Sequence, residues 1–224
     1  MPSRGMSRLL PAFVLACALL AIGAGTWLPQ WPALYGVAKA TTTALIIAWA
    51  WGRGRPGSAV HRALLAGLML SWCGDVALLW PREGFLLGLV AFLLAHLAYL
   101  VAFTRVARLA ARPLSFAAYA VVAGAILWAL WPGVPVALRA PVVAYVVCLA
   151  SMAAQAAVVW RCTAPGPERS RAGVLALGGA LFVASDALLA TNRFAAALPW
   201  ANLFILATYW SAQMCIAQWL PPRR

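Results

Sequence analysis

The feature that most constrains this chain is a succession of long apolar runs separated by short polar breaks. A bilayer core of about 30 Å requires roughly 20 apolar residues per helix, and each run reaches that length. The breaks contain proline and glycine, and tryptophans stand at many run ends, as at a membrane–water interface. The sequence therefore predicts an all-α, polytopic membrane bundle of about eight transmembrane helices, forming a single domain over residues 1–224. The predicted spans are 9–28, 33–51, 63–80, 85–103, 114–131, 140–160, 172–190 and 199–220.

Composition indicates that lipid surrounds most of this surface. The chain is 65% hydrophobic and 9% charged, whereas a soluble domain carries about 25% charged residues. Its 17 Lys and Arg outnumber its 4 Asp and Glu, but they lie in short clusters between apolar runs. This is the pattern of membrane topology and not of a basic nucleic-acid-binding face. We expect membrane lipids as its surroundings and no nucleic acid partner.

The arginines also predict an orientation. Most of them lie in alternate breaks, and the opposite set of breaks holds only Arg82, Arg139 and Arg193. By the positive-inside rule, both termini are then cytoplasmic. Arg4 and Arg8 precede the first run, but no small-residue cleavage site follows it, so we expect this run to be retained. The frequent Ala, Arg, Gly and Pro, with a single lysine, favour a GC-rich bacterial genome and hence the bacterial inner membrane.

Three charged residues fall inside predicted spans: Asp75, Asp186 and Lys39. A charge at membrane depth costs several kcal/mol and therefore needs a partner, a cavity or a function. In the predicted topology all three lie about 9 Å below the outer surface, at 1.5 Å of rise per residue. A purely structural alternative pairs Lys39 with one aspartate to lock two helices together. That alternative leaves the second aspartate unexplained.

Other polar residues occur in the fourth and eighth runs. His96 and Tyr99 lie about one helical turn apart, and so do Tyr209 and Gln213. Any one such pair is typical of hydrogen bonding between helices, and His96 alone is equally well a core histidine. Several pairs together with two acids predict a polar cavity within the bundle.

The sequence contains a weak internal repeat. One shift of the chain superposes Asp75 on Asp186 and Arg82 on Arg193. The third and seventh helices are then parallel equivalents, which predicts a possible four-plus-four parallel repeat.

Motifs for other chemistries are missing from the sequence. The 5 cysteines include no C-x-x-C pair, and there are only 2 histidines, so we expect no metal site and no cofactor. The sequence also lacks a phosphate-binding loop, a G-x-S-x-G elbow and an H-E-x-x-H motif. The sequence therefore carries none of the usual motifs of nucleotide-driven pumps or serine hydrolases.

Several segments resemble the YhhN-like integral membrane proteins, the lysoplasmalogenase family. They are Gly74-Asp75 with the helix through His96 and Tyr99, the segment 179–194, and the stretch 207–213. Lys39 resembles the family's Lys-Pro motif, although Ala40 replaces the proline. The resemblance implies hydrolysis of the vinyl ether bond of lysoplasmalogens to a fatty aldehyde and a glycerophospho-ethanolamine or -choline. It also implies that Asp75 and Asp186 are catalytic.

Vinyl ether hydrolysis suits two carboxyl groups in different protonation states. The slow step is protonation of the alkene carbon, after which water adds to the resulting cation. Our hypothesis is that the aspartate nearer Lys39 stays ionised as the base and the other is the general acid. The substrate enters from the bilayer, and no metal or cofactor is required. The residues expected around it are Lys39, His96, Tyr99, Arg82 or Arg193 at the phosphate, and Asn192, Tyr209 and Gln213 at the glycerol oxygens.

Two other function classes remain open at this point. Intramembrane Asp, Lys and His also serve proton-coupled transporters, so the same cluster is compatible with transport. A lipid-binding scaffold without activity is the third possibility. Release of aldehyde in detergent micelles separates the enzyme from both, because micelles have no two sides between which to transport.

Overall fold

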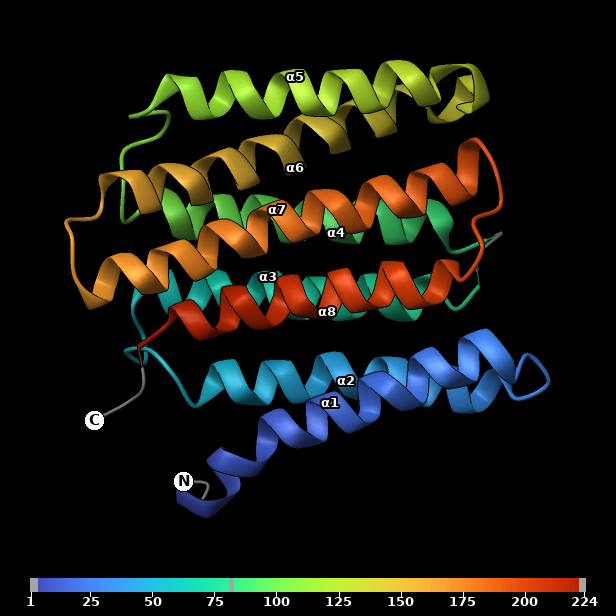
Figure 1. Ribbon diagram of the computed structural model, residues 1–224, viewed down its shortest axis with the longest axis horizontal. Helices are drawn as coiled ribbons and strands as arrows, with labels where there is room; N and C mark the ends of the chain where they lie inside the picture. Colours follow the sequence, from blue (N-terminus) through green and yellow to red (C-terminus); the bar gives the residue numbers. More distant parts are fainter. Residues whose placement is uncertain (1–3, 81–82, 222–224) are drawn as a thin grey trace.

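The computed structural model describes residues 4–80 and 83–221, and within these ranges the chain is all-helical (Figure 1). Eight α-helices fall on the eight predicted apolar runs, which confirms the fold class. The helices are α1 (Arg4–Trp27), α2 (Pro32–Trp51), α3 (Ala59–Ala77), α4 (Phe85–Thr104), α5 (Pro113–Leu130), α6 (Val136–Cys162), α7 (Pro167–Phe194) and α8 (Ala201–Trp219), with a 3-10 turn, η1 (Trp131–Gly133), between α5 and α6.

Local chemistry sets where several helices begin. Proline occupies the first turn of α2, α5 and α7, where its missing N–H costs nothing. Ser58 caps α3, because its hydroxyl accepts a hydrogen bond from the His61 backbone N–H at 3.2 Å. As a result α3 begins at Ala59 instead of at residue 63. Helix α6 begins at Val136 and not at residue 140. The charged Arg139 interrupts the apolar run, but the helix continues through it.

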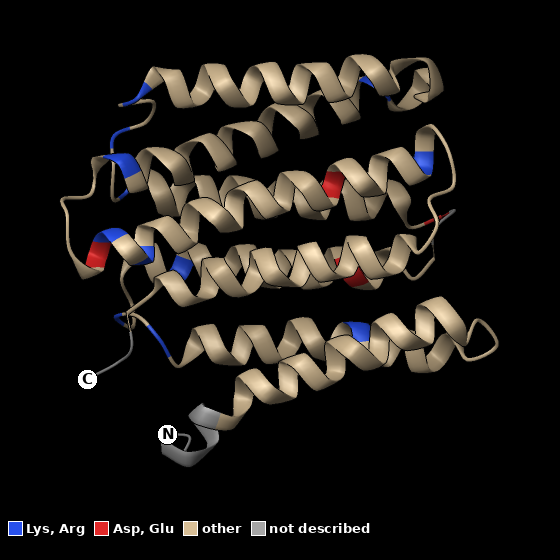
Figure 2. Ribbon diagram, in the orientation of Figure 1, with Lys and Arg blue, Asp and Glu red and all other residues tan. Residues whose placement is uncertain are grey.

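The helices run side by side, with α1 and α2 at one edge of the bundle and α5 and α6 at the other (Figure 1). The beginning of α1 and the end of α8 lie at the same end. Most Lys and Arg residues gather at that end (Figure 2), as the alternation of arginine-rich breaks predicts. The direction of this end across the membrane and the four-plus-four repeat stay predictions.

Six helices (α1, α2, α4, α5, α6 and α7) are long and apolar enough to cross a membrane. Helices α3 and α8 are not among them, since they carry polar residues such as Asp75 and Gln213. Both lie in the middle of the bundle in Figure 1. A helix covered by other helices does not need an apolar surface on every side, so the interior is where polar residues are tolerated.

Two glycines of α3 allow α3 and α4 to pack closely, next to the site described in the next section. A Cβ on Gly67 would lie 2.3 Å from the ring of Tyr99, and one on Gly74 would lie 2.6 Å from the ring of Phe92. Small residues allow such close packing of helices in membranes. The two glycines therefore fix the positions of two aromatic rings that contribute to the site described next.

Candidate functional site

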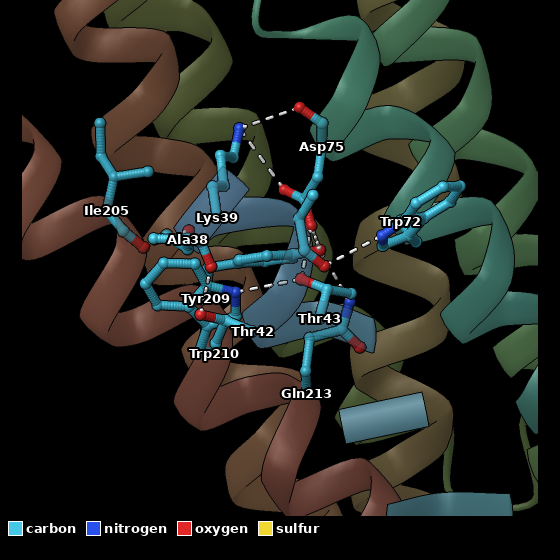
Figure 3. A network of polar contacts seen from close by, with 12 residues as sticks. Ala38, Lys39, Thr42, Thr43, Trp72, Asp75, Ile205, Tyr209, Trp210 and Gln213 are labelled. Atoms are coloured by element: carbon cyan, nitrogen blue, oxygen red, sulfur yellow. Dashed lines mark hydrogen bonds and ion pairs between the residues drawn. The ribbon is translucent and has the colours of Figure 1, made fainter. Parts of the chain in front are cut away.

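Asp75, near the end of α3, is enclosed by hydrogen-bond donors from two other helices (Figure 3). Its Oδ2 accepts hydrogen bonds from the Thr43 hydroxyl at 2.7 Å and the Tyr209 hydroxyl at 2.8 Å. The Lys39 ammonium lies 3.5 Å from Oδ1 and donates to the Asp75 backbone oxygen at 3.3 Å. Asp75 is 2% exposed and Lys39 5% exposed. Lys39 therefore pairs with Asp75. Of the two aspartates, Asp75 is the one beside the lysine.

A second layer of polar groups holds these donors in place. The Trp210 indole N–H donates to the Thr43 hydroxyl at 3.1 Å, and the Gln213 amide donates to the Tyr209 hydroxyl at 3.2 Å. The Tyr99 hydroxyl donates to the Gln213 carbonyl at 2.7 Å. We call Lys39, Thr43, Asp75, Tyr99, Tyr209, Trp210 and Gln213 the Asp75 network. All seven side chains are buried, so the network is closed to the surroundings.

Asp186, in the second half of α7, has a different environment. Within the described residues its carboxylate takes part in one hydrogen bond, which it accepts from the Tyr145 hydroxyl of α6. The side chain is partly exposed and faces a cavity formed by α3 to α7. Asp186 is therefore the more accessible of the two intramembrane carboxyl groups.

The cavity beside Asp186 is almost wholly apolar. Its walls are mainly Leu, Val, Ile, Ala and Phe, and its empty space, including the open part, is about 900 Å³. Asp186, Tyr145 and Arg193 supply the ionisable or hydroxyl groups of its lining. Arg193, at the end of α7, lies with its guanidinium 4.8 Å from the Phe85 ring centroid. Walls of this apolar character suit a hydrocarbon chain.

The cavity beside Asp186 is therefore not the polar cavity that the sequence predicts. Tyr99, Tyr209 and Gln213 do not line the cavity, because they hydrogen-bond to one another and to Asp75. A buried donor that already has a partner is not free to shape a polar space.

A series of aromatic contacts connects Tyr209, the partner of Asp75, with Tyr145, the partner of Asp186. The Tyr209 ring packs edge-on against Phe92 and Phe182, with centroids 5.8 and 5.6 Å apart. His96 packs edge-on against Phe182 at 4.7 Å and Tyr145 at 5.3 Å. Asp75 is not among the residues that line the cavity. The structure therefore does not bring Asp75 and Asp186 together in one space.

The remaining predicted site residues have separate positions. His96 is fully buried, and neither ring nitrogen has a hydrogen-bond partner within the described residues, so it packs as an aromatic ring. Asn192 is exposed and its carbonyl accepts a hydrogen bond from the Leu198 backbone N–H at 2.9 Å, in the α7–α8 connection. Arg82 lies outside the described residues. None of these placements tests the predicted roles, which stay predictions.

Sequence reasoning missed three residues of this region, Thr43, Trp210 and Tyr145. A signal for Thr43 was available, because it follows Lys39 by four residues and therefore shares its helix face. Tyr145 stands among Val and Ala residues of the sixth run with no polar motif around it. Its significance becomes visible only through its approach to Asp186 from another helix.

The fold and site define a class: a helical integral membrane protein with one carboxyl group at an apolar, partly open cavity. The chain belongs to the YhhN family, whose sequence model matches residues 34–220. This confirms the family that the motifs resemble. No solved structure matches the chain.

Several curated relatives of this chain are named lysoplasmalogenase. Lysoplasmalogenase TMEM86B of Sus scrofa is 37% identical over 170 residues, covering 72% of this chain and 64% of the pig protein. Lysoplasmalogenase TMEM86B of Mus musculus is 31% identical over 217 residues, covering 93% of this chain and 84% of the mouse protein. Lysoplasmalogenase of Mycobacterium tuberculosis is 32% identical over 146 residues, covering 60% of this chain and 51% of that protein. These names support the prediction of an enzyme of the lysoplasmalogenase type.

Proposed function

We propose that this protein hydrolyses lysoplasmalogens in the membrane, cleaving the vinyl ether bond to a fatty aldehyde and a glycerophospho-ethanolamine or -choline. The names of its relatives support the substrate class. The observation that carries the proposal is the position of Asp186: a carboxyl group with one hydrogen bond, at the wall of an apolar, partly open cavity.

The proposed first step is proton transfer from Asp186. The carboxylic acid gives its proton to the alkene carbon farther from the ether oxygen, and the electron pair of the double bond forms the new C–H bond. The positive charge is then shared between the neighbouring carbon and the ether oxygen. The carboxylate left on Asp186 stabilises this cation across an apolar space, where an electrostatic attraction is stronger than in water.

Water completes the reaction. It adds to the cationic carbon, which gives a hemiacetal, and one of its protons passes to the base and from there back to Asp186, which restores the acid. The hemiacetal then collapses: its C–O bond to glycerol breaks, its hydroxyl proton moves to the glycerol oxygen, and the aldehyde and the glycerol hydroxyl result. No electron is transferred to or from the lipid, so the step balances without an oxidant or reductant.

Tyr145 is the proposed positioning residue for Asp186. Its hydroxyl donates to Oδ2, which leaves Oδ1 to carry the transferable proton. Once that proton has left, the same hydrogen bond acts on a carboxylate and becomes stronger. Tyr145 thus favours the state of Asp186 that exists after proton transfer.

Asp75 is the proposed ionised member of the pair, because Lys39 lies beside it. A role as base for the attacking water has to act through Tyr209, whose hydroxyl donates to Asp75 and whose ring contacts Phe92 at the cavity wall. Arg193, which also lines the cavity, is the proposed contact for the substrate phosphate. The bacterial inner membrane with cytoplasmic termini stays the expected location.

The test is aldehyde release by the purified protein in detergent micelles, with alkenyl lysophosphatidylethanolamine and -choline as substrates. Asp186→Asn should lower kcat by about 10²- to 10⁴-fold, the contribution expected of a general acid. Glu168→Gln is the matched control, since it removes an exposed carboxylate at the start of α7. An alkyl ether analogue, which has no alkene to protonate, should release no aldehyde.

Each outcome has a defined meaning. No aldehyde from folded wild-type protein on either headgroup removes vinyl ether hydrolysis and favours proton-coupled transport. Aldehyde from wild type and from folded Asp186→Asn keeps the enzyme but rejects Asp186 as its acid. Loss of activity in Asp186→Asn but not in Asp75→Asn rejects the two-aspartate scheme and leaves Asp186 as both acid and subsequent base.

A further inference from the structure

A second cavity lies at the arginine-rich end of the bundle, away from Asp186. It is formed where the end of α2 and the beginning of α7 flank the end of α8. The lining residues are Trp49, Arg53, Ser170, Arg171, Val174 and Gln218. Figure 2 shows this end of the molecule as the one where Lys and Arg gather. The cavity thus combines positive charge with the helix ends, where lipid headgroups lie.

Arg53 is held rigidly in this cavity. Its Nε donates to the Leu220 backbone oxygen at 2.9 Å and its Nη2 to the Gln218 backbone oxygen at 3.0 Å. Its guanidinium also lies 5.0 Å from the Trp49 ring centroid. These contacts leave Nη1 without a hydrogen-bond partner within the described residues. Because the side chain is already fixed, binding of an anion costs little further side-chain entropy.

Two positive charges face the same cavity. Burial and, second, the charge of Arg171 lower the pKa of the Arg53 guanidinium, which reports that the two arginines repel each other. Arg171 has one carboxylate partner, Glu168, at 2.9 Å, but that carboxylate is 74% exposed and is only a weak counter-charge. An anion between the arginines would relieve the repulsion.

An unpaired donor adds an independent observation. The indole nitrogen of Trp49 is buried and has no hydrogen-bond partner within the described residues, although Trp49 lines the cavity. A buried N–H without an acceptor costs about 1–3 kcal/mol and is uncommon in folded proteins. The Ser170 hydroxyl lines the same cavity and adds a neutral donor.

We propose that this cavity is a binding site for a phosphate group, contacted by Arg53, Arg171, the Trp49 indole N–H and Ser170. Guanidinium groups and neutral N–H and O–H donors match the oxygens of a phosphate. Because the cavity opens at the helix ends, we assign the phosphate to an anionic phospholipid of the adjoining leaflet. The site is separate from the Asp186 cavity and does not depend on the proposed hydrolysis.

The experiment is calorimetric titration of the full-length protein in maltoside micelles with dihexanoyl phosphatidylglycerol, and separately with inorganic phosphate. Empty micelles supply the background. Arg171→Gln should weaken lipid binding by about tenfold, the value of one charge-assisted hydrogen bond. Trp49→Phe should weaken it by about fivefold, since it keeps the ring beside Arg53 but removes the donor. Arg161→Gln, an equal charge loss at an exposed residue of the same end, should change binding by at most about twofold.

The two probes distinguish the source of the phosphate. Competition by inorganic phosphate supports a site for the phosphate group alone, and lipid binding without such competition supports a site for the headgroup. Equal weakening by Arg161→Gln and Arg171→Gln means a diffuse charge effect and overturns the proposal. Unchanged affinity in both single variants, Trp49→Phe and Arg171→Gln, also overturns it. Failure of the wild type to bind the lipid does the same.

Discussion

The Asp75 network and the Asp186 cavity place the same functional group in opposite surroundings. Asp75 is 2% exposed and has three side-chain partners, whereas Asp186 is partly exposed and accepts one hydrogen bond within the described residues. A buried carboxylate with its full set of partners stabilises the one arrangement of helices that supplies those partners. A carboxyl with one partner at the wall of a cavity keeps an oxygen for another molecule. Under the proposed function, the first region contributes mainly to stability and the second mainly to chemistry.

The difference arises from which helices meet. Asp75 faces α2 and α8, where the polar side chains Lys39, Thr43 and Tyr209 are available. Asp186 faces α6 and the apolar walls from α3 to α5, where Tyr145 is the available hydroxyl. The following predictions separate the two regions by measuring stability and catalysis on the same variants.

Removing Lys39 should give the largest effect on stability. Lys39→Met leaves the Asp75 carboxylate buried without its counter-charge, which should cost about 3–5 kcal/mol of unfolding free energy. The measurement is unfolding by sodium dodecyl sulfate titration in mixed micelles, followed by far-ultraviolet circular dichroism.

The double variant Lys39→Met with Asp75→Asn is the matched control. Because it removes both charges, it should be more stable than Lys39→Met alone. Asp186→Asn should unfold within about 1 kcal/mol of wild type, since it changes one hydrogen bond. A Lys39→Met protein as stable as wild type would contradict an ionised Lys39–Asp75 pair.

Tyr209→Phe should have a smaller effect of the same kind. It removes the hydroxyl that donates to Asp75 and leaves the Gln213 amide without its acceptor, which should cost about 2 kcal/mol. The same titration measures it. Tyr119→Phe is the control, because Tyr119 has no side-chain hydrogen bond within the described residues, and it should change stability by less than about 0.5 kcal/mol. Equal losses in the two variants would show that the network does not hold the helices together.

Tyr145→Phe should act on catalysis instead of stability. Loss of the hydrogen bond to Asp186 should lower kcat by about tenfold or more and leave KM near its wild-type value, because the bond strengthens only as the carboxylate forms. Steady-state aldehyde release measures both constants. An increase in KM with unchanged kcat would mean that Tyr145 shapes the cavity and does not position Asp186.

The sequence predicted the helices well, because a span of about 20 apolar residues is a local property. It also offered a pair between Lys39 and one aspartate, as the structural alternative. It did not identify Asp75 as the partner, because that depends on how α2 packs against α3. The same limit explains Tyr145, whose contact with Asp186 joins two helices far apart in sequence.

The prediction of a polar cavity shows a second limit. Periodicity places polar residues on a helix face but does not say whether they hydrogen-bond to each other or to a ligand. Tyr99, Tyr209 and Gln213 come from two helices and pair with one another, and they do not line the Asp186 cavity. The wall around Asp186 is apolar because the residues that line it are mainly Leu, Val, Ile, Ala and Phe.

Arg193 gives the smallest predicted effect and the most specific test of how substrate lies in the cavity. The guanidinium is exposed and packs on Phe85 at the cavity lining, so a phosphate there stays partly in water and its ion pair is weak. Arg193→Gln should therefore raise KM for an alkenyl lysophospholipid by about fivefold, with kcat unchanged. For an alkenyl glycerol, which has no phosphate, KM should be the same in variant and wild type. A lower kcat on both substrates would instead place Arg193 near the reacting ether, and the headgroup would then have to lie elsewhere than at the end of α7.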